Sequence, residues 1–227
     1  MAETYARTRP PYPRAAVERA ATELGISSDA KVLDLAAGTG NLTRTLRAVF
    51  ADVVAVEPDE RMRAHFDGAI LDGSAEAIPL GDRAVDAVFV GEAFHWFDFD
   101  VAFAEMQRVA RSGLAVFGRL WGIKEQPGLL PQPFLDDLDD VWARFHGDST
   151  HESFPDWRDV VRPDGPERFV DVVPISGRDL VDLHLTGSTP ASIAHDERQA
   201  IAERAYPLMD DLYKLRVVTY LYWRRLG

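Results

Sequence analysis

A short turn of small residues is the first place in this sequence where a ligand could meet the backbone. Gly38 and Gly40 flank Thr39, directly after an apolar run at residues 32–35. Glycine allows a ligand to come within van der Waals contact of the main chain. Asn41 can cap the helix that follows. A strand, a tight turn and a helix form the first half of a nucleotide-binding βαβ unit, although an ordinary small α/β turn gives the same pattern.

An acidic residue ends the next predicted strand, at residues 51–57. Glu57 lies 17 residues after Gly40. An acidic side chain at the tip of the second strand is where a dinucleotide site holds a ribose. A surface glutamate before a turn is the alternative, but the glycine turn upstream favours the ribose role.

A cluster of rings follows the strand predicted at residues 85–90. The stretch from Gly91 to Asp98 contains Phe94, His95 and Trp96. Ligands of open parallel sheets bind outside the carboxyl ends of the strands, so these side chains would line a crevice. His95 could act as a general base, or it could bond the backbone within a wall of rings. The rings could also pack under the next helix.

The elements needed to position these residues alternate between strand and helix, which predicts a doubly wound α/β fold with a mostly parallel, seven-stranded sheet. An amphipathic helix at residues 134–145 has an acidic outer face and predicts a cap over an apolar surface. Further strands are expected at residues 69–72, 114–120, 168–174 and 216–224, and further helices at residues 14–24, 59–66, 99–111, 179–185 and 196–212, the last broken near Pro207.

These elements divide the chain into four parts. Residues 1–13 form an N-terminal strap or lid, residues 14–121 a Rossmann-like cofactor-binding core, residues 122–166 a helical cap inserted after the fifth strand, and residues 167–227 the C-terminal completion of the sheet. The strap contains Pro10, Pro11 and Pro13, which favour an extended chain. It shows no obvious core residues, so we expect a mobile lid; a surface arm packed by its rings is the alternative.

Composition restricts the possible partners. A net charge of −12 over 227 residues makes a nucleic-acid partner a poor expectation. The absence of cysteine excludes disulfides, thiolate metal sites and a cysteine nucleophile, and no metal site is predicted. No stretch reaches membrane-spanning length and the N-terminus has no signal-peptide core, so a cytoplasmic protein without a membrane partner is expected.

Two ligands suit the glycine turn. The dinucleotide fingerprint has a third glycine three residues after the second, but Thr43 stands there. S-adenosylmethionine needs the close backbone approach without the full phosphate cradle, and its positive charges suit Asp34, Glu57 and Glu92. The sequence therefore favours S-adenosylmethionine. An NAD(P)-binding oxidoreductase and a non-catalytic S-adenosylmethionine-binding scaffold remain the alternatives.

Several motifs together resemble a known family. The run from Val32 to Gly40, the segment from Gly73 to Leu80 and the loop Ala93-Phe-His-Trp-Phe-Asp98 are similar to class I S-adenosylmethionine-dependent methyltransferases of the type 11 group. The N-terminal pattern Tyr5-x-x-x-Arg9-Pro-x-Tyr12-Pro13 is similar to the branch that includes trans-aconitate-type methyltransferases. The resemblance is continuous from Tyr5 to about Trp121.

The resemblance implies a set of cofactor contacts. Asp34 would face the ammonium group and Glu57 both ribose hydroxyls, while Tyr5 or Arg9 would lie near the cofactor carboxylate. Ser74 stands where many relatives place an aspartate on the adenine amine. The implied cofactor-binding residues are Tyr5, Arg9, Asp34, Ala36, Gly38, Gly40, Glu57, Pro58, Met62, Ser74, Ala75, Glu76 and Gly91.

The acceptor is expected to be a small molecule methylated on oxygen, either a carboxylate or a hydroxyl. The sequence after residue 90 lacks the Asn/Asp-Pro-Pro-Tyr/Phe motif of methyltransferases that act on amino groups. A carboxylate is favoured because three arginines, Arg7, Arg9 and Arg119, could reach the mouth of the crevice. His95 is the candidate catalytic residue, and the predicted acceptor-binding residues are Phe94, His95, Trp96 and Trp121.

Overall fold

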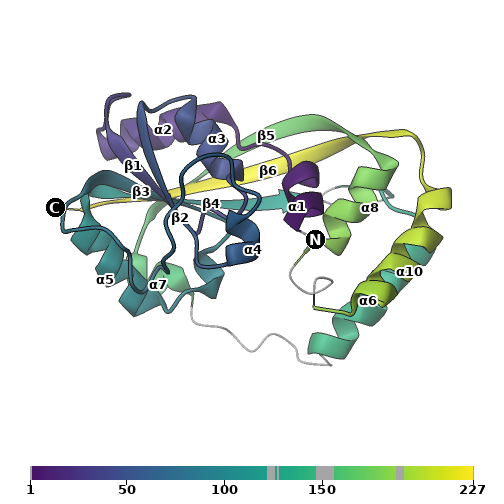
Figure 1. Ribbon diagram of the computed structural model, residues 1–227. Helices are drawn as coiled ribbons and strands as arrows, with labels where there is room; N and C mark the ends of the chain where they lie inside the picture. The colour runs from purple at the N-terminus through teal and green to yellow at the C-terminus, as the bar shows by residue number, and fades with distance from the viewer. Residues whose placement is uncertain (1, 122–125, 127, 147–155, 188–191, 227) are drawn as a thin grey trace.

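The computed structural model describes residues 2–121, 126, 128–146, 156–187 and 192–226. Six strands form one sheet in the order β2-β1-β3-β4-β6-β5 (Figure 1). Strands β1 to β4 are parallel, and β6 runs antiparallel to both of its neighbours. The predicted α/β fold with a mostly parallel sheet is confirmed. The strands are β1 Lys31–Leu35, β2 Asp52–Val56, β3 Val85–Gly91, β4 Ala110–Trp121, β5 Asp164–Ser176 and β6 Leu212–Arg225.

The prediction of a seventh strand at residues 69–72 is wrong for the described chain. This segment makes only an isolated parallel bridge, between Leu71 and Val56 at the β2 edge. Leu71 is 40% exposed, so no buried face holds the segment against the sheet. A short edge segment without a buried face gains too little from packing to extend its pairing.

Several helix ends follow local signals, but the expected cap at Asn41 is wrong, because the N-cap of α3 is Gly40 and Asn41 is the first residue of the helix. Asp98 caps α5 by accepting from the Val101 amide, and Gly25, with φ +67°, ends α2. The last predicted helix is shorter than expected, because Pro207 lies in the 3-10 turn η2 and β6 follows. The helices are α1 Ala2–Thr8, α2 Arg14–Leu24, α3 Asn41–Arg47, α4 Glu60–Arg63, η1 Phe94–Trp96, α5 Phe99–Val109, α6 Gln132–His146, α7 Trp157–Val161, α8 Gly177–Leu185, α10 His195–Ala205 and η2 Tyr206–Leu208.

Helices cover both faces of the sheet, as the alternation of side chains along each strand requires. Val32 and Phe89 pack in the layer with α2 and α3, while Leu33 and Val90 pack in the layer with α5 and α7. All four side chains are fully buried. Two apolar layers therefore fix the parallel strands and, with them, the carboxyl edge where β1, β2 and β3 end.

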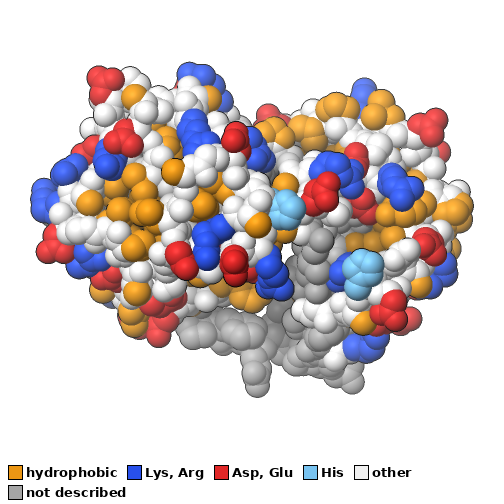
Figure 2. Space-filling model, in the orientation of Figure 1, with side chains coloured by type: hydrophobic (Ala, Val, Ile, Leu, Met, Phe, Trp, Pro, Cys, Tyr) orange, Lys and Arg blue, Asp and Glu red, His pale blue; other side chains and the backbone are white. Residues whose placement is uncertain are grey.

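Three helices form a second cluster, which we call the helical lobe: α6, α8 and α10 (Figure 1). Phe134, Leu180 and Ile201 are buried at its centre. The long strands β5 and β6 reach from the sheet into this lobe, where Leu215 and Val217 join its core. Figure 2 shows the surface hollowed between the two lobes. Helices α8 and α10 thus pack with α6, although the sequence grouped them with the completion of the sheet.

The N-terminal segment contacts both the helical lobe and the core of the sheet. Residues Ala2–Thr8 form helix α1, which lies against α8 (Figure 1). Arg7 forms ion pairs with two carboxylates of α8, one of them Asp182 at 2.7 Å. Tyr12 is only 5% exposed and packs edge-on against Phe117 at 5.7 Å between ring centroids. The expectation of a segment without core residues is wrong, because Tyr12 belongs to the core beneath α2.

Candidate functional site

The turn after β1 adopts a conformation that leaves room for a ligand. Gly38 and Gly40 have φ of +58° and +83°, and Ala36 has φ of +56°. A positive φ at alanine is strained by about 1–2 kcal/mol. A Cβ at Gly40 would lie 3.0 Å from the Phe66 ring, whereas a Cβ at Gly38 would meet nothing within 4 Å. Glycine at position 40 is thus favoured by its positive φ and by the close Phe66 ring, and Gly38 presents its backbone to open space.

Glu57 links this turn to the end of β2. Its Oε2 accepts a hydrogen bond from the Gly38 amide and its Oε1 accepts one from the Asp59 amide, both at 2.9 Å. The side chain is 7% exposed. A carboxylate has about four acceptor positions, so Glu57 can accept further hydrogen bonds from the hydroxyls of a sugar.

Asp34, at the end of β1, carries a buried oxygen without a partner. Thr43 Oγ1 donates to its Oδ2 at 2.5 Å, while its Oδ1 has no hydrogen bond. Burial raises the pKa of Asp34 to about 7, with a further increase from the Glu57 carboxylate. An unpaired buried acceptor costs free energy that a donor can recover. The pair of acidic residues therefore fits a ligand that brings hydroxyls and positive charge.

The other predicted cofactor residues are placed less uniformly. Pro58 is exposed, Met62 and Ser74 are half-buried, and Ala75 is in the core. The Glu76 side chain accepts from the Asp98 amide at 3.0 Å. The structure thus brings the glycine turn, Asp34 and Glu57 together at one edge and leaves these five residues around it.

The side chain of Tyr12 lies where a Cβ at position 91 would stand. A Cβ at Gly91 would lie 2.5 Å from the Tyr12 hydroxyl oxygen. The close approach of Tyr12 to the end of β3 therefore excludes any larger residue. The role of Gly91 in this structure is to admit the N-terminal segment, and its predicted contact with a cofactor stays a prediction.

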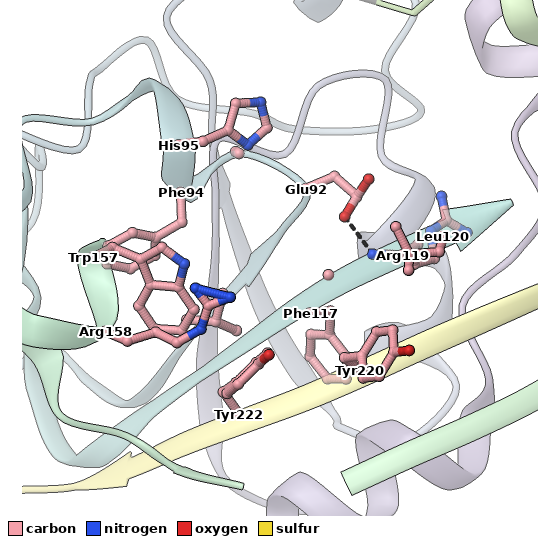
Figure 3. A pocket seen from close by; sticks show the side chains of 13 residues that line it. Glu92, Phe94, His95, Phe117, Arg119, Leu120, Trp157, Arg158, Tyr220 and Tyr222 are labelled. Carbon is pink, nitrogen blue, oxygen red and sulfur yellow. Dashed lines mark hydrogen bonds between the residues drawn. The ribbon is translucent and has the colours of Figure 1, made fainter. Parts of the chain in front are cut away.

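A pocket of about 390 Å³ lies beside the ends of β3 and β4 (Figure 3). Its walls come from the turn after β3, from β4, from β6 and from α7. Phe94 and His95 line it as predicted, but Trp96 and Trp121 do not, and Trp96 is 68% exposed. We call this the aromatic pocket; residues that characterise it are Glu92, His95, Trp157, Arg158, Tyr220 and Tyr222.

Sequence reasoning missed the wall that α7 and β6 contribute. Tyr220 and Tyr222 alternate along β6, opposite Gly118 and Val116 of β4. That alternation predicted a strand but could not show which face would border a pocket. Trp157 lies within residues 149–165, where the sequence predicts no regular element, and it reaches the site because α7 packs against α5.

Glu92 occupies a strained position at the centre of the pocket. Its φ is +56°, and its Oε1 accepts from the Arg119 amide at 2.5 Å. Burial raises the pKa of Glu92, while the charges of Arg119 and Arg9 act in the opposite direction. Strained residues held by their surroundings cluster at functional sites. Glu92 is therefore a candidate functional residue, although the sequence offered it only as part of the acidic surroundings.

His95 lies at the edge of the pocket. Its side chain is exposed, its ring lies 4.9 Å from the Trp96 ring, and partial desolvation lowers its pKa. Within the described part of the chain its ring nitrogens make no hydrogen bond. His95 is thus available to a ligand but is not oriented by a protein partner.

The three arginines expected at the crevice mouth are engaged elsewhere. Arg7 pairs with α8, and Arg9 donates to the Thr186 carbonyl at 3.1 Å. The Arg9 guanidinium also lies 4.4 Å from the Tyr5 ring centroid and 4.7 Å from that of Trp121. Arg119 donates to the Pro10 carbonyl at 2.5 Å and lies 4.0 Å over the Tyr12 ring. Of the three, Arg119 lines the pocket, and its Nε, like that of Arg9, is buried without a hydrogen bond among the described residues.

Comparisons with known proteins agree with this architecture. Residues 33–117 match a family model described as a methyltransferase domain. An uncharacterised methyltransferase of Mycobacterium tuberculosis is 41% identical over 127 residues, which are 54% of this chain and 50% of that protein. A methyltransferase-like protein of Schizosaccharomyces pombe is 29% identical over 160 residues, 68% of this chain and 60% of that one. The chain spans about half the length of the curated relatives that it matches first.

Solved structures show the same fold. A candidate type II methyltransferase from Anaeromyxobacter dehalogenans superposes with a TM-score of 0.62 at 20% identity, covering 96% of this chain and 97% of that one. The sheet, its antiparallel strand β6 and the glycine turn thus define a Rossmann-like methyltransferase fold. With the match over residues 33–117, this chain is similar to methyltransferase domains in both sequence and fold. Its place in the trans-aconitate branch stays a prediction.

Two features outside the site complete the description. None of the helices in the described ranges is long and apolar enough to cross a membrane. The same ranges contain no group of three or more His, Cys, Asp or Glu side chains arranged to hold a metal ion.

Proposed function

We propose that this chain transfers the methyl group of S-adenosylmethionine to an oxygen atom of a small-molecule acceptor. One observation carries the proposal. The glycine turn and Glu57, which together could hold a cofactor, lie at the same edge of the sheet as the aromatic pocket at the ends of β3 and β4. S-adenosylmethionine, when bound, supplies an electrophilic methyl group on a sulfonium centre. The chain contributes mainly positioning, which can supply much of the reduction in barrier.

Three residues would hold the cofactor in this proposal. Glu57 would accept from the ribose hydroxyls, the unpaired Oδ1 of Asp34 would face positive charge, and the Gly38 backbone would border the methionine part. Thr43, which replaces the third glycine of a dinucleotide site, is fully buried and bonded to Asp34. This arrangement favours S-adenosylmethionine over the alternative of a nicotinamide cofactor.

The pocket favours a hydroxyl acceptor over a carboxylate. A carboxylate acceptor would lie near the Glu92 carboxylate, and like charges in a partly buried site repel each other. The charges of Arg119 and Arg9 offset part of this repulsion, but both guanidinium groups already donate to backbone carbonyls, those of Pro10 and Thr186. A relative from Methylococcus capsulatus, named a malonyl-[acyl-carrier protein] O-methyltransferase, supports oxygen as the acceptor atom, but a malonyl group offers a carboxylate oxygen, so it does not support a hydroxyl in particular. It is 41% identical over 95 residues, which are 37% of this chain and 34% of that protein.

An acceptor screen tests this proposal. The purified chain is incubated with methyl-labelled S-adenosylmethionine and with sets of phenols, aliphatic alcohols, carboxylic acids and amines, and label in the products is measured. We expect transfer to hydroxyl compounds. Transfer confined to amines would contradict the oxygen assignment. Binding of S-adenosylhomocysteine without transfer to any class would favour the scaffold alternative.

A further inference from the structure

The walls of the aromatic pocket are planar rings that hold one another in place. Trp157 lies 4.8 Å from Phe94 and meets Tyr222 at 5.3 Å with an interplanar angle of 84°. Tyr220, two positions before Tyr222 on β6, lines the same side of the pocket (Figure 3). Rings fixed in this way form flat apolar surfaces on which another ring can stack or pack edge-on.

Two charged groups of the pocket, Arg158 and Glu92, differ in how far their polar atoms are already bonded to the protein. Arg158 donates from Nη1 to both carboxylate oxygens of Asp156, at 2.7 and 2.6 Å. Its guanidinium lies 5.5 Å from the Trp157 ring and 5.3 Å from the Tyr222 ring. Glu92, in contrast, bonds the Arg119 amide through one oxygen, and Figure 3 shows its other oxygen pointing away from β4. Glu92 therefore offers a hydrogen-bond acceptor to a ligand, in a pocket whose lining also includes His95 and Arg119.

We propose that the aromatic pocket takes a phenolic acceptor and that the Glu92 carboxylate accepts the proton of its hydroxyl. This inference rests on the proposed function and names its substrate class. In the step, the O–H bond breaks and its proton passes to Glu92. The phenol oxygen forms a bond to the methyl carbon, and the carbon–sulfur bond of S-adenosylmethionine breaks with its electron pair left on sulfur.

The chemistry of phenols fits a carboxylate base. A phenol has a pKa near 10, as in tyrosine, so it gives up its proton far more readily than an aliphatic alcohol. General-base catalysis is most efficient when the pKa of the base lies near the working pH, and burial moves the pKa of Glu92 in that direction. The groups that face Glu92 are Arg119 on β4, Arg9 and Tyr12 of the N-terminal segment, and His95 in η1.

Binding of model compounds tests the inference without requiring turnover. The protein is first saturated with S-adenosylhomocysteine, and 4-nitrophenol, cyclohexanol and benzoate are then titrated separately at about pH 6 and about pH 9. The variants are Glu92→Gln, which removes the charge, and Glu203→Gln as a matched control. Glu203 accepts a hydrogen bond from Gln199 in the helical lobe, away from the aromatic pocket.

The expected result has two parts. In the wild type and in Glu203→Gln, 4-nitrophenol binds at least about tenfold more tightly than cyclohexanol or benzoate, and its affinity falls about tenfold from pH 6 to pH 9. The fall arises because the phenolate and the Glu92 carboxylate repel each other once the shared proton is lost. In Glu92→Gln this pH dependence is reduced to about twofold or less.

Several outcomes would overturn the inference. Equal or tighter binding of cyclohexanol or benzoate would remove the phenolic class, as would failure of all three compounds to bind. An unchanged pH dependence in Glu92→Gln would remove Glu92 as the proton acceptor. Failure of S-adenosylhomocysteine to saturate the wild type would instead contradict the proposed function, so the two failures are distinguishable. The melting temperature of each variant shows whether it is folded.

Discussion

The cofactor edge and the aromatic pocket are neighbours at the ends of the same parallel strands, but they are assembled over very different lengths of chain. At the cofactor edge Gly38 donates to Glu57 and Thr43 donates to Asp34, and the bonded residues are no more than 19 positions apart. The aromatic pocket joins Glu92, from the turn after β3, with Tyr222, which reaches it through the pairing of β4 with β6. The first region is specified by local turns, and the second by long-range packing.

This difference separates two tasks within one molecule. The glycine turn and Glu57 need only a strand, a turn and the next strand to reach their positions. The pocket needs α7 against α5 and β6 beside β4 before its walls exist. Cofactor binding is thus a local property of the chain, whereas the shape of the acceptor site depends on the whole sheet. The predictions below test how far the two regions are independent.

The largest expected effect concerns the N-terminal segment, which touches both regions. Tyr12→Ala should lower the free energy of unfolding by about 3–5 kcal/mol, as for other large buried rings. The ring packs on Phe117 and lies under the Arg119 guanidinium. Urea unfolding of the ligand-free protein measures the change, with Tyr5→Ala on α1 as control. A loss below about 1 kcal/mol would show that the segment is a separate surface arm.

A smaller effect is expected at the cofactor edge. Glu57→Ala should weaken the binding of S-adenosylhomocysteine by about 2–3 kcal/mol, because a charged acceptor that can bond two hydroxyls is lost. Calorimetric titration measures this change, and Glu60→Ala, at an exposed position on α4, is the control. If the cofactor edge is local, the pH dependence of 4-nitrophenol binding should be unaffected by Glu57→Ala. Equal affinity of the variant and the wild type for S-adenosylhomocysteine would remove the ribose assignment.

The smallest effect is a pH dependence of stability that arises from Asp34. The pKa of Asp34 is raised to about 7 in the folded protein, against about 3.9 in an unfolded chain. The folded state therefore binds more protons between these values, and stability falls as pH rises from about 4 to about 7. The free energy of unfolding of the wild type should therefore decrease between about pH 5 and about pH 8, and in Asp34→Asn this decrease should be smaller by about 2 kcal/mol.

Urea unfolding at the two pH values checks the Asp34 prediction. Asp67→Asn, on the loop after α4, changes the same kind of residue at an exposed position and serves as the control. The two variants should differ in the pH dependence of their unfolding free energies. An identical pH dependence in Asp34→Asn and the wild type would contradict the raised pKa of Asp34.

Much of the fold could be predicted because its signals are local. Apolar runs such as residues 32–35 and the cap at Asp59 act within a few residues, and the structure contains the elements that they predict. The segment at residues 69–72 was misjudged because its strand-like pattern has no buried face to support it. The N-terminal segment was misjudged because the burial of Tyr12 depends on Phe117, more than 100 positions away.

The candidate site divides in the same way. The sequence identified the glycine turn, Asp34 and Glu57, which the structure brings together. It placed Trp96 and Trp121 at the acceptor because rings near a strand end are expected there, but rotation about the 3-10 turn leaves Trp96 exposed. The sequence could not predict the position of Trp157, because no local pattern indicates the surface against which α7 packs.

One titration tests the central claim, that this chain uses S-adenosylmethionine. The purified protein is titrated calorimetrically with S-adenosylhomocysteine and, in a separate experiment, with NADH. The account predicts saturable binding of S-adenosylhomocysteine at one site per chain and much weaker or no binding of NADH. Tighter binding of NADH than of S-adenosylhomocysteine would contradict the account and support the oxidoreductase alternative.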